Sequence, residues 1–201
     1  MSRKIRSLQA IVLCEGKDDV DTIEAIVSKM EIQIASNVAL SECGGVCKLK
    51  ELASVVATLA SLSRKMSTIA LVIDLDNQSI RNRLDSLINS LRAHSVTVED
   101  PTQLGGSIFS TSKGDLKILI KIVGRTDLTF TRHEMEDYSV NLLLLRKEIQ
   151  ATDIQGFEKP SEYMEHVQMK PVDVISRSSD AEVKQAYDNI IKLISFLALQ
   201  E

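Results

Sequence analysis

Hydrophobic and polar positions divide the chain into two alternating kinds of segment. Short, almost entirely apolar runs rich in Val, Ile and Leu occur at 8–14 and 68–73. Such runs are typical of strands that are buried on both faces of a parallel sheet. Between them lie longer segments, such as 18–30, in which apolar residues recur at helical spacing. This alternation predicts an α/β fold with a mostly parallel sheet and helices on both faces.

The same pattern gives the expected elements of the first half of the chain. Strands are predicted at 8–14, 37–41, 68–73 and 96–98, and helices from residue 18, over 48–66 and over 79–93. The turn before the second helix contains Gly44-Gly45. We expect the large apolar side chains of the helix over 48–66 to face inward, namely Leu49, Leu52, Val55, Val56, Leu59 and Leu62.

The pattern changes after residue 100. Strand-like stretches at 107–111 and 116–123 are joined by Lys113-Gly114-Asp115, which predicts a hairpin or a pair of edge strands. From Thr131 the chain is expected to be helical, and a last helix is predicted over 183–199. We therefore expect a core with added strands at 1–125 and a helical C-terminal extension packed on it at 126–201.

Bulk composition is that of an ordinary globular protein. Of the 201 residues, 44% are hydrophobic and 26% are charged. No apolar run approaches the roughly 20 residues that a membrane-spanning helix needs, and the basic start leads into a strand rather than a signal peptide. These features predict a cytoplasmic protein with no membrane partner.

Charge, aromatic content and cysteine spacing each narrow the possible chemistry. The net charge of −4 argues against nucleic-acid binding through bulk positive charge. Three Tyr, four Phe and no Trp are too few for a platform on which bases stack. The spacing of Cys14, Cys43 and Cys47 is unlike that of a zinc site, so we interpret them as small hydrophobic residues. An enzyme that meets phosphate through a metal ion is compatible with all three features.

Three carboxylates follow two of the predicted strands. Glu15 ends the first apolar run, and Asp74 and Asp76 end the run at 68–73. If these strands are parallel neighbours, all three carboxylates meet at the edge where α/β sheets bind ligands. Crowded carboxylates repel one another unless a cation lies among them, and oxygen ligands suit Mg²⁺ or Mn²⁺. Replacing Asp76 by Asn is therefore expected to leave the stability of the metal-free protein unchanged or to raise it.

The two acidic stretches resemble the motifs of the Toprim domain. This module is shared by topoisomerases, bacterial-type primases, nucleases of the overcoming-lysogenisation-defect family and small stand-alone proteins. Its first motif is a strand ending in Glu-Gly, here Glu15-Gly16, and its second is a strand ending in Asp-x-Asp, here Asp74-Leu75-Asp76. A glycine turn commonly lies between them, and Gly44-Gly45 fits it. The resemblance covers roughly the first half of the chain and implies a Rossmann-like Toprim fold.

The resemblance also implies a function. It implies Mg²⁺-dependent phosphodiester chemistry on DNA or RNA, and a nuclease above all, because there is no room for the strand-passage machinery of a topoisomerase and no recognisable zinc module or partner-binding region of a primase. Glu15, Asp74 and Asp76 would be the catalytic residues and would bind the metal together with Glu136. For Glu136 and its neighbour Glu134 the alternative is a pair of acids that favour the dipole at a helix start. The rival hypothesis is a catalytically silent Toprim module that acts as an adaptor for a protein partner in a nucleic-acid-processing complex.

Other interpretations of single residues stay open. Phosphatases of the haloacid-dehalogenase family also carry Asp-x-Asp after a strand, although theirs is the first strand of the chain. Gly16 and Gly45 would let a phosphate approach the backbone, or they are ordinary turn glycines. Lys17, Lys117 and Lys121 are candidate phosphate contacts. The alternative for the last two is a solvated strand face or a sheet edge protected by lysine.

Overall fold

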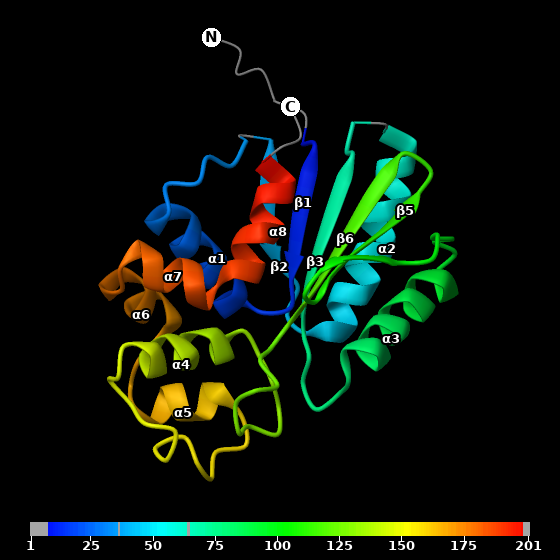
Figure 1. Cartoon of the computed structure of the whole chain (residues 1–201). Coiled ribbons are helices and arrows are strands. Elements are labelled where there is room, and N and C mark those ends of the chain that lie inside the picture. Colours follow the sequence, from blue (N-terminus) through cyan, green and yellow to red (C-terminus); the bar gives the residue numbers. More distant parts are fainter. Residues whose placement is uncertain (1–7, 36, 64, 199–201) are drawn as a thin grey trace.

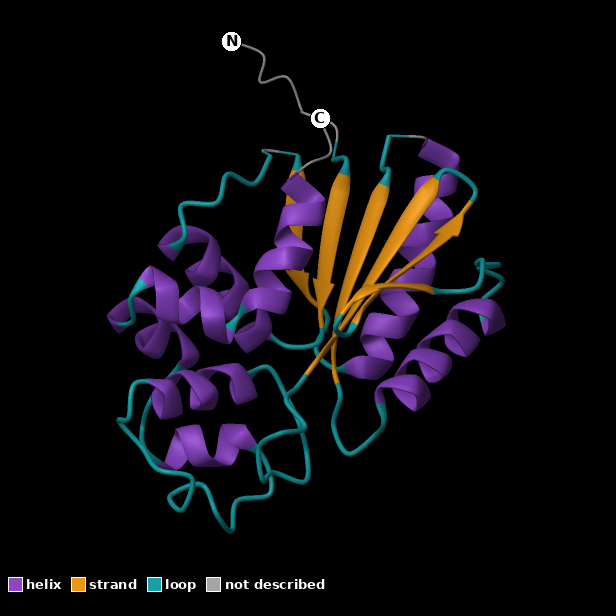
Figure 2. Cartoon of the chain, viewed as in Figure 1, coloured by secondary structure: helices purple, strands orange, loops and turns teal. Residues whose placement is uncertain are grey.

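The strands form one mixed sheet in the computed structural model, which describes residues 8–35, 37–63 and 65–198. The strand order within these residues is β2-β1-β3-β6-β5-β4 (Figures 1 and 2). β2, β1, β3 and β6 are parallel neighbours, and β5 and β4 continue the sheet in antiparallel fashion. The predicted α/β class with a mostly parallel sheet and an added hairpin is confirmed.

The bounds of the elements agree closely with the expected positions from β1 to α3. The strands are β1 (Ala10–Cys14), β2 (Val38–Glu42), β3 (Thr68–Asp74), β4 (Thr102–Gly105), β5 (Ile108–Lys113) and β6 (Leu116–Val123). The helices are α1 (Lys17–Lys29), α2 (Val46–Ser63), α3 (Ile80–Ala93), α4 (Glu136–Leu145), α5 (Pro160–His166), α6 (Pro171–Arg177), α7 (Asp180–Ala186) and α8 (Asp188–Ala198). None of the described helices has the length and apolar character needed to cross a bilayer.

The sheet is apolar on both faces because helices cover both. Along β3, Leu71 and Ile73 belong to the hydrophobic cluster formed with α2 and α3. Ala70 and Val72 belong to the opposite cluster, which α1 and helices α4 to α8 complete. Figure 1 shows α1 and α8 on one side of the strands and α2 and α3 on the other. This double burial explains why the strands read as continuous apolar runs.

Helix α2 contradicts the prediction for its large apolar residues. Its buried face consists of Leu49, Ala53, Ala57 and Ala60. Val55, Leu59 and Leu62 are instead 54%, 58% and 79% exposed. The alanines let the helix approach the sheet closely, so its larger residues are left on the outer face, while Leu52 and Val56 are partly buried at the margin.

Two predicted elements differ from those in the structure: one strand is missing, and one helix begins later than expected. The strand predicted at 96–98 is absent: Val96 and Val98 alternate inward into the core, but β4 occupies the sheet edge. Helix α4 begins at Glu136 rather than near Thr131, because His133 forms an antiparallel bridge to Asp76.

The C-terminal helices are shorter than the apolar pattern indicates. The helix predicted over 183–199 is broken between α7 and α8 at Tyr187, a fully buried residue whose hydroxyl lies 2.6 Å from Ser139 Oγ. Residue 199 itself lies outside the described residues. Pro160 and Pro171 each begin a short helix, because proline is well suited to the first helical turn.

Lys121 is completely buried in the middle of the sheet. Its ammonium group donates to Ser107 Oγ and lies 5.8 Å from the centre of the Tyr138 ring. Burial lowers the pKa of Lys121 to about 7. Because β6 has strands on both sides, neither Lys121 nor Lys117 protects a sheet edge, and that interpretation is wrong.

The replacement Lys121→Met tests the cost of burying this ammonium group. The pKa of Lys121 is about 7 when folded, and that of a free lysine is about 10.4, so the unfolded chain binds more protons between these values. Stability should therefore rise with pH across this window in the wild type. We expect Lys121→Met to gain on the order of 1–4 kcal/mol at pH 7 and to lose this pH dependence. Chemical denaturation at a series of pH values measures both effects, with Lys117→Met as the control. A Lys121→Met protein less stable than the wild type at pH 7 would contradict the argument.

Candidate functional site

The carboxyl ends of β1 and β3 bring the two acidic motifs together. Cys14 is paired with Val72 across the parallel strands, so the chain leaves both strands at the same edge. Glu15 Oε2 accepts a hydrogen bond from the backbone N–H of Asp74 at 3.3 Å. The N–H of Gly45 donates to the carbonyl of Glu15 at 2.8 Å, and Gly45 has a φ of 110° that favours glycine. The predicted meeting of the two motifs at one edge is therefore present.

Two arginines bind the carboxylate of Asp76. Arg83 Nη2 donates to Asp76 Oδ2 at 3.0 Å, and Arg132 Nη2 donates to Asp76 Oδ1 at 2.9 Å. Arg83 also donates to Glu15 Oε2 at 3.3 Å and to the carbonyl of Asp74 at 2.6 Å. The side chain of Arg83 is only 4% exposed, so its guanidinium group is a buried cation between the two acidic motifs. Neither arginine could be recognised from the sequence, because no local pattern shows which distant acid an arginine will reach.

The backbone of Asp76 is fixed to the C-terminal extension. Its N–H donates to the carbonyl of His133 at 2.8 Å, and the N–H of His133 donates back at 3.0 Å. Asp76 has a φ of 56°, a left-handed conformation that aspartate tolerates better than most residues. Gly124 lies where these segments cross: a Cβ there would come within 2.7 Å of His133 Cβ and 3.1 Å of Leu75 Cβ. Only glycine therefore allows this crossing.

Asp137 fixes the segment that leads into α4. Its Oδ2 accepts the N–H of Arg125 at 2.8 Å and that of Glu134 at 3.2 Å, and it lies 3.1 Å from His133 Nδ1. Burial raises the pKa of Asp137 to about 8 and lowers the pKa of His133. This buried residue holds the segment that carries Arg132 to Asp76. It is a positioning residue that the sequence analysis did not identify.

A second group of acids surrounds Asp74. Asp74 Oδ1 is buried and has no hydrogen-bond partner among the residues that the structure describes. Burial raises the pKa of Asp74 well above its usual value, and the charges of Asp19, Glu15, Glu136 and Glu134 raise it further. Burial, followed by neighbouring negative charge, likewise raises the pKa of Asp19 and that of Glu136 to about 7. At this edge burial, followed by the neighbouring acids, makes the ionised form of these carboxyls unfavourable.

Asp19 is a further buried acid at this edge. It lies in the first turn of α1, the helix that follows Glu15, where its Oδ2 accepts the N–H of Gly16 at 2.9 Å. It is also only 5% exposed. The available signal was the short connection after β1: with Gly16 as the N-cap of α1, the acid at the third helical position lies close to the end of the strand.

The acids suit a hard divalent cation by their chemistry, because all their donors are oxygens and Asp74 Oδ1 lacks a partner. Among the described residues, however, no three His, Cys, Asp or Glu side chains are arranged so that they could hold a metal ion. Between Glu15 and Asp76 the positive charge is supplied by Arg83. An ion shared by Glu15, Asp74 and Asp76 therefore stays a prediction.

The candidate phosphate contacts are separated by the fold. Lys17 is exposed at the start of α1, on the same edge as Glu15. Lys117 is paired with Thr68 at the opposite end of β3 from Asp74, and Lys121 is buried. The predicted phosphate track along β6 beside the acidic site is therefore wrong, because neither lysine of this strand reaches the carboxylates from solvent.

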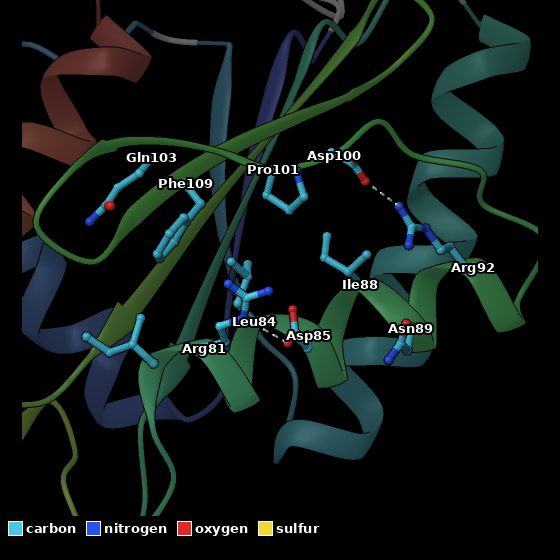
Figure 3. Close-up of a pocket in the computed structure, with 11 residues that line it drawn as sticks. Arg81, Leu84, Asp85, Ile88, Asn89, Arg92, Asp100, Pro101, Gln103 and Phe109 are labelled. Carbon is cyan, nitrogen blue, oxygen red and sulfur yellow. Dashed lines mark hydrogen bonds and ion pairs between the residues drawn. The ribbon is translucent and has the colours of Figure 1, made fainter.

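A cavity of about 790 Å³ lies beside α3 rather than at the carboxylates (Figure 3). Its apolar lining includes Leu84, Ile88 and Phe109. Its charged groups neutralise each other, since Arg81 lies 3.6 Å from Asp85 and Arg92 lies 3.2 Å from Asp100. None of the predicted site residues lines it. The cavity has no excess positive charge that would attract phosphate.

Asp76 has two arginine partners, whereas Asp74 Oδ1 has no hydrogen-bond partner among the described residues, so replacing each acid should change stability in opposite directions. In metal-free buffer at pH 8 we expect Asp74→Asn to raise the unfolding free energy by roughly 1–3 kcal/mol, because it removes an unpaired buried charge. Asp76→Asn should lower it by roughly as much, because Arg83 and Arg132 lose a partner. This reverses the expectation from sequence alone. Denaturation with a chelator present measures both variants, with the exposed Asp85→Asn as control. A stabilised Asp76→Asn protein would show that the arginine pairs contribute little.

Comparisons with known proteins identify the family. No curated protein matches the chain. Two solved structures of the C-terminal region of the Xanthomonas campestris pv. campestris OLD protein, phased with mercury and with iodine, are 14% and 12% identical to it. Each comparison covers 96% of this chain and 98% of that chain with a TM-score of 0.42, a likeness too weak to carry an argument. Residues 9–128 match the model of a family described as "Protein of unknown function (DUF3226)", and this range includes Glu15, Asp74, Asp76 and Arg83. The chain therefore belongs to the DUF3226 family.

Proposed function

We propose that this protein is a metal-dependent nuclease that hydrolyses phosphodiester bonds in DNA or RNA. The observation that carries the proposal is the meeting of Glu15 and Asp74 at the carboxyl edge of a parallel sheet. This is the edge at which α/β proteins bind their ligands. The resemblance of both motifs to those of Toprim enzymes supports the same chemistry.

The residues proposed to hold Mg²⁺ or Mn²⁺ are Asp74, Glu136, Asp19 and Glu15, which would have to come closer together around the ion than they lie in this structure. The unpaired Asp74 Oδ1 and the raised pKa of each of these carboxyls point to a site that lacks positive charge. A bound divalent ion would supply Lewis-acid polarisation of the phosphate and would favour ionisation of a water molecule.

Glu15 is the proposed general acid and base. Its Oε2 is fixed by the N–H of Asp74 and by Arg83, so the orientation of the carboxyl is set by the core. Burial raises the pKa of Glu15, so the pH at which this carboxyl takes up a proton is closer to neutral. The ionised carboxylate would accept a proton from the attacking water, and the protonated carboxyl would then donate it to the leaving oxygen.

Arg132 is the proposed phosphate contact. Its side chain is 41% exposed, in contrast to the 4% of Arg83, and guanidinium groups bind phosphate with two parallel hydrogen bonds. When Arg132 exchanges the carboxylate of Asp76 for a substrate phosphate, Asp76 becomes available as a further oxygen ligand. Lys17, exposed at the same edge, is a second candidate for a phosphate contact.

The second candidate function is a catalytically silent adaptor that binds nucleic acid or a protein partner. The observation that favours it is Arg83, because a buried guanidinium group already neutralises Glu15 and Asp76. In an adaptor these ion pairs would stabilise the edge of the sheet, and no ion would be required.

A turnover assay separates the two functions. Single-stranded, duplex and structured DNA and RNA are incubated with Mg²⁺ or Mn²⁺. We expect Glu15→Gln to reduce cleavage by roughly 10²–10⁴-fold while nucleic-acid binding is retained, since the variant cannot transfer a proton. Asp74→Asn should abolish cleavage, and a higher metal concentration should recover part of it. Glu24→Gln, which changes an exposed acid of α1, is the matched control.

Two outcomes would count against the nuclease, and a third would change only the role of Glu15. Cleavage that neither Glu15→Gln nor Asp74→Asn reduces would place the activity elsewhere. Rescue of Glu15→Gln by added metal would assign that residue to the ion rather than to proton transfer. A wild-type protein that binds nucleic acid or a partner without metal-dependent turnover on any substrate would favour the adaptor.

A further inference from the structure

Helix α2 presents a stripe of apolar side chains to solvent. Val55, Leu59 and Leu62 are 54%, 58% and 79% exposed, and together with the exposed Thr58 they follow one face of the helix. We call these four residues the α2 stripe. The described residues contain six exposed large hydrophobic side chains, and the three most exposed ones are all in this stripe. Single exposed hydrophobic residues are normal, but a contiguous row is typical of an interaction surface.

The surface around the stripe is shaped to accept another helix. Leu59 is a ridge between two apolar hollows of about 420 and 460 Å³. The first hollow is also lined by Val55, Thr58 and His94, and the second by Ile11, Leu62 and Met66. A ridge flanked by two hollows is complementary to a copy of itself, because helices pack with the ridges of one in the grooves of the other.

The distribution of charged residues along α2 indicates what kind of partner the stripe would bind. Residues 52–63 contain no charged side chain, so the α2 stripe itself carries no charge. The exposed Lys48 and Glu51 lie before it in the same helix, where Glu51 also lines the first hollow, and the basic Lys65 follows the helix. Two antiparallel copies would bring Glu51 of each near Lys65 of the other, whereas two parallel copies would bring like charges together. An antiparallel pair also aligns the helix dipoles favourably.

We propose that the α2 stripe is a homodimer interface in which two copies of α2 pack antiparallel about a two-fold axis. In such an interface, if residue i contacts residue j, then j contacts i. With the axis between Thr58 and Leu59, Val55 lies opposite Leu62 of the second copy and Thr58 lies opposite Leu59. Every apolar member of the stripe then has an apolar or small partner. The stripe contains none of the carboxylates or arginines of the candidate site, so this dimer does not depend on the proposed function.

The first test is the oligomeric state. Sedimentation velocity from low micromolar to several hundred micromolar protein should show a monomer that converts to a dimer. Leu62→Lys, at the most exposed position, should shift the midpoint to at least a tenfold higher concentration and should leave the circular dichroism melt unchanged. The matched control is Val172→Lys on α6, a hydrophobic residue that is 38% exposed and distant in sequence from the stripe. A wild type that stays monomeric, or a dimer that Leu62→Lys does not weaken, would overturn the proposal.

The second test distinguishes the antiparallel from the parallel arrangement. In a Cys47→Ser background, Thr58→Cys places two cysteines about 1.5 Å apart along the antiparallel pair, and Val55→Cys places them about 10 Å apart. Disulfides require Cα atoms within about 7 Å, so oxidation should cross-link the Thr58→Cys protein and not the Val55→Cys protein. Cross-linking of Val55→Cys instead would exclude the antiparallel arrangement.

Discussion

The buried guanidinium group of Arg83 is the contact on which the acidic edge of the sheet depends. Arg83 is in the first turn of α3, and it reaches back to the carbonyl of Asp74 and to the carboxylates of Glu15 and Asp76. A buried charge of this kind is strongly destabilising when a partner is removed, so its three contacts fix the ends of β1 and β3 relative to α3. The same cation determines which acid stays unpaired: Asp76 is neutralised, whereas Asp74 is left among other carboxylates.

Segments that are distant in the sequence also meet at this acidic edge of the sheet. The bridge between Asp76 and His133, the close crossing at Gly124 and the hydrogen bonds of Asp137 bring the segment before α4 against the end of β3. The same contacts place Arg132 and Glu136 at the candidate site. The candidate site therefore combines residues inside the range that matches the family with residues that follow it.

Sequence patterns revealed what depends on local periodicity and missed what depends on tertiary pairing. The strand runs that end in Glu15 and Asp74 were recognisable because burial on both faces leaves an apolar signature. Lys121 looked like one member of an alternating exposed row, but its neighbours in the sheet bury it. In α2, helical spacing alone could not decide whether leucines or alanines face the sheet, because both sets recur along the helix. Arg83 and Arg132 gave no signal, since an ion pair between distant residues leaves no periodic trace.

One hydrophobic cluster includes residues from both halves of the chain: Val12 and Val72 from the sheet, and Tyr138, Leu142 and Ile190 from the C-terminal helices. These helices supply much of the apolar surface that covers one face of the strands. A shortened chain that ended after β6 would expose that face to water, lose Arg132 from Asp76 and present a broad surface prone to aggregation. Limited proteolysis in the C-terminal half should consequently precipitate the protein rather than release a smaller folded core.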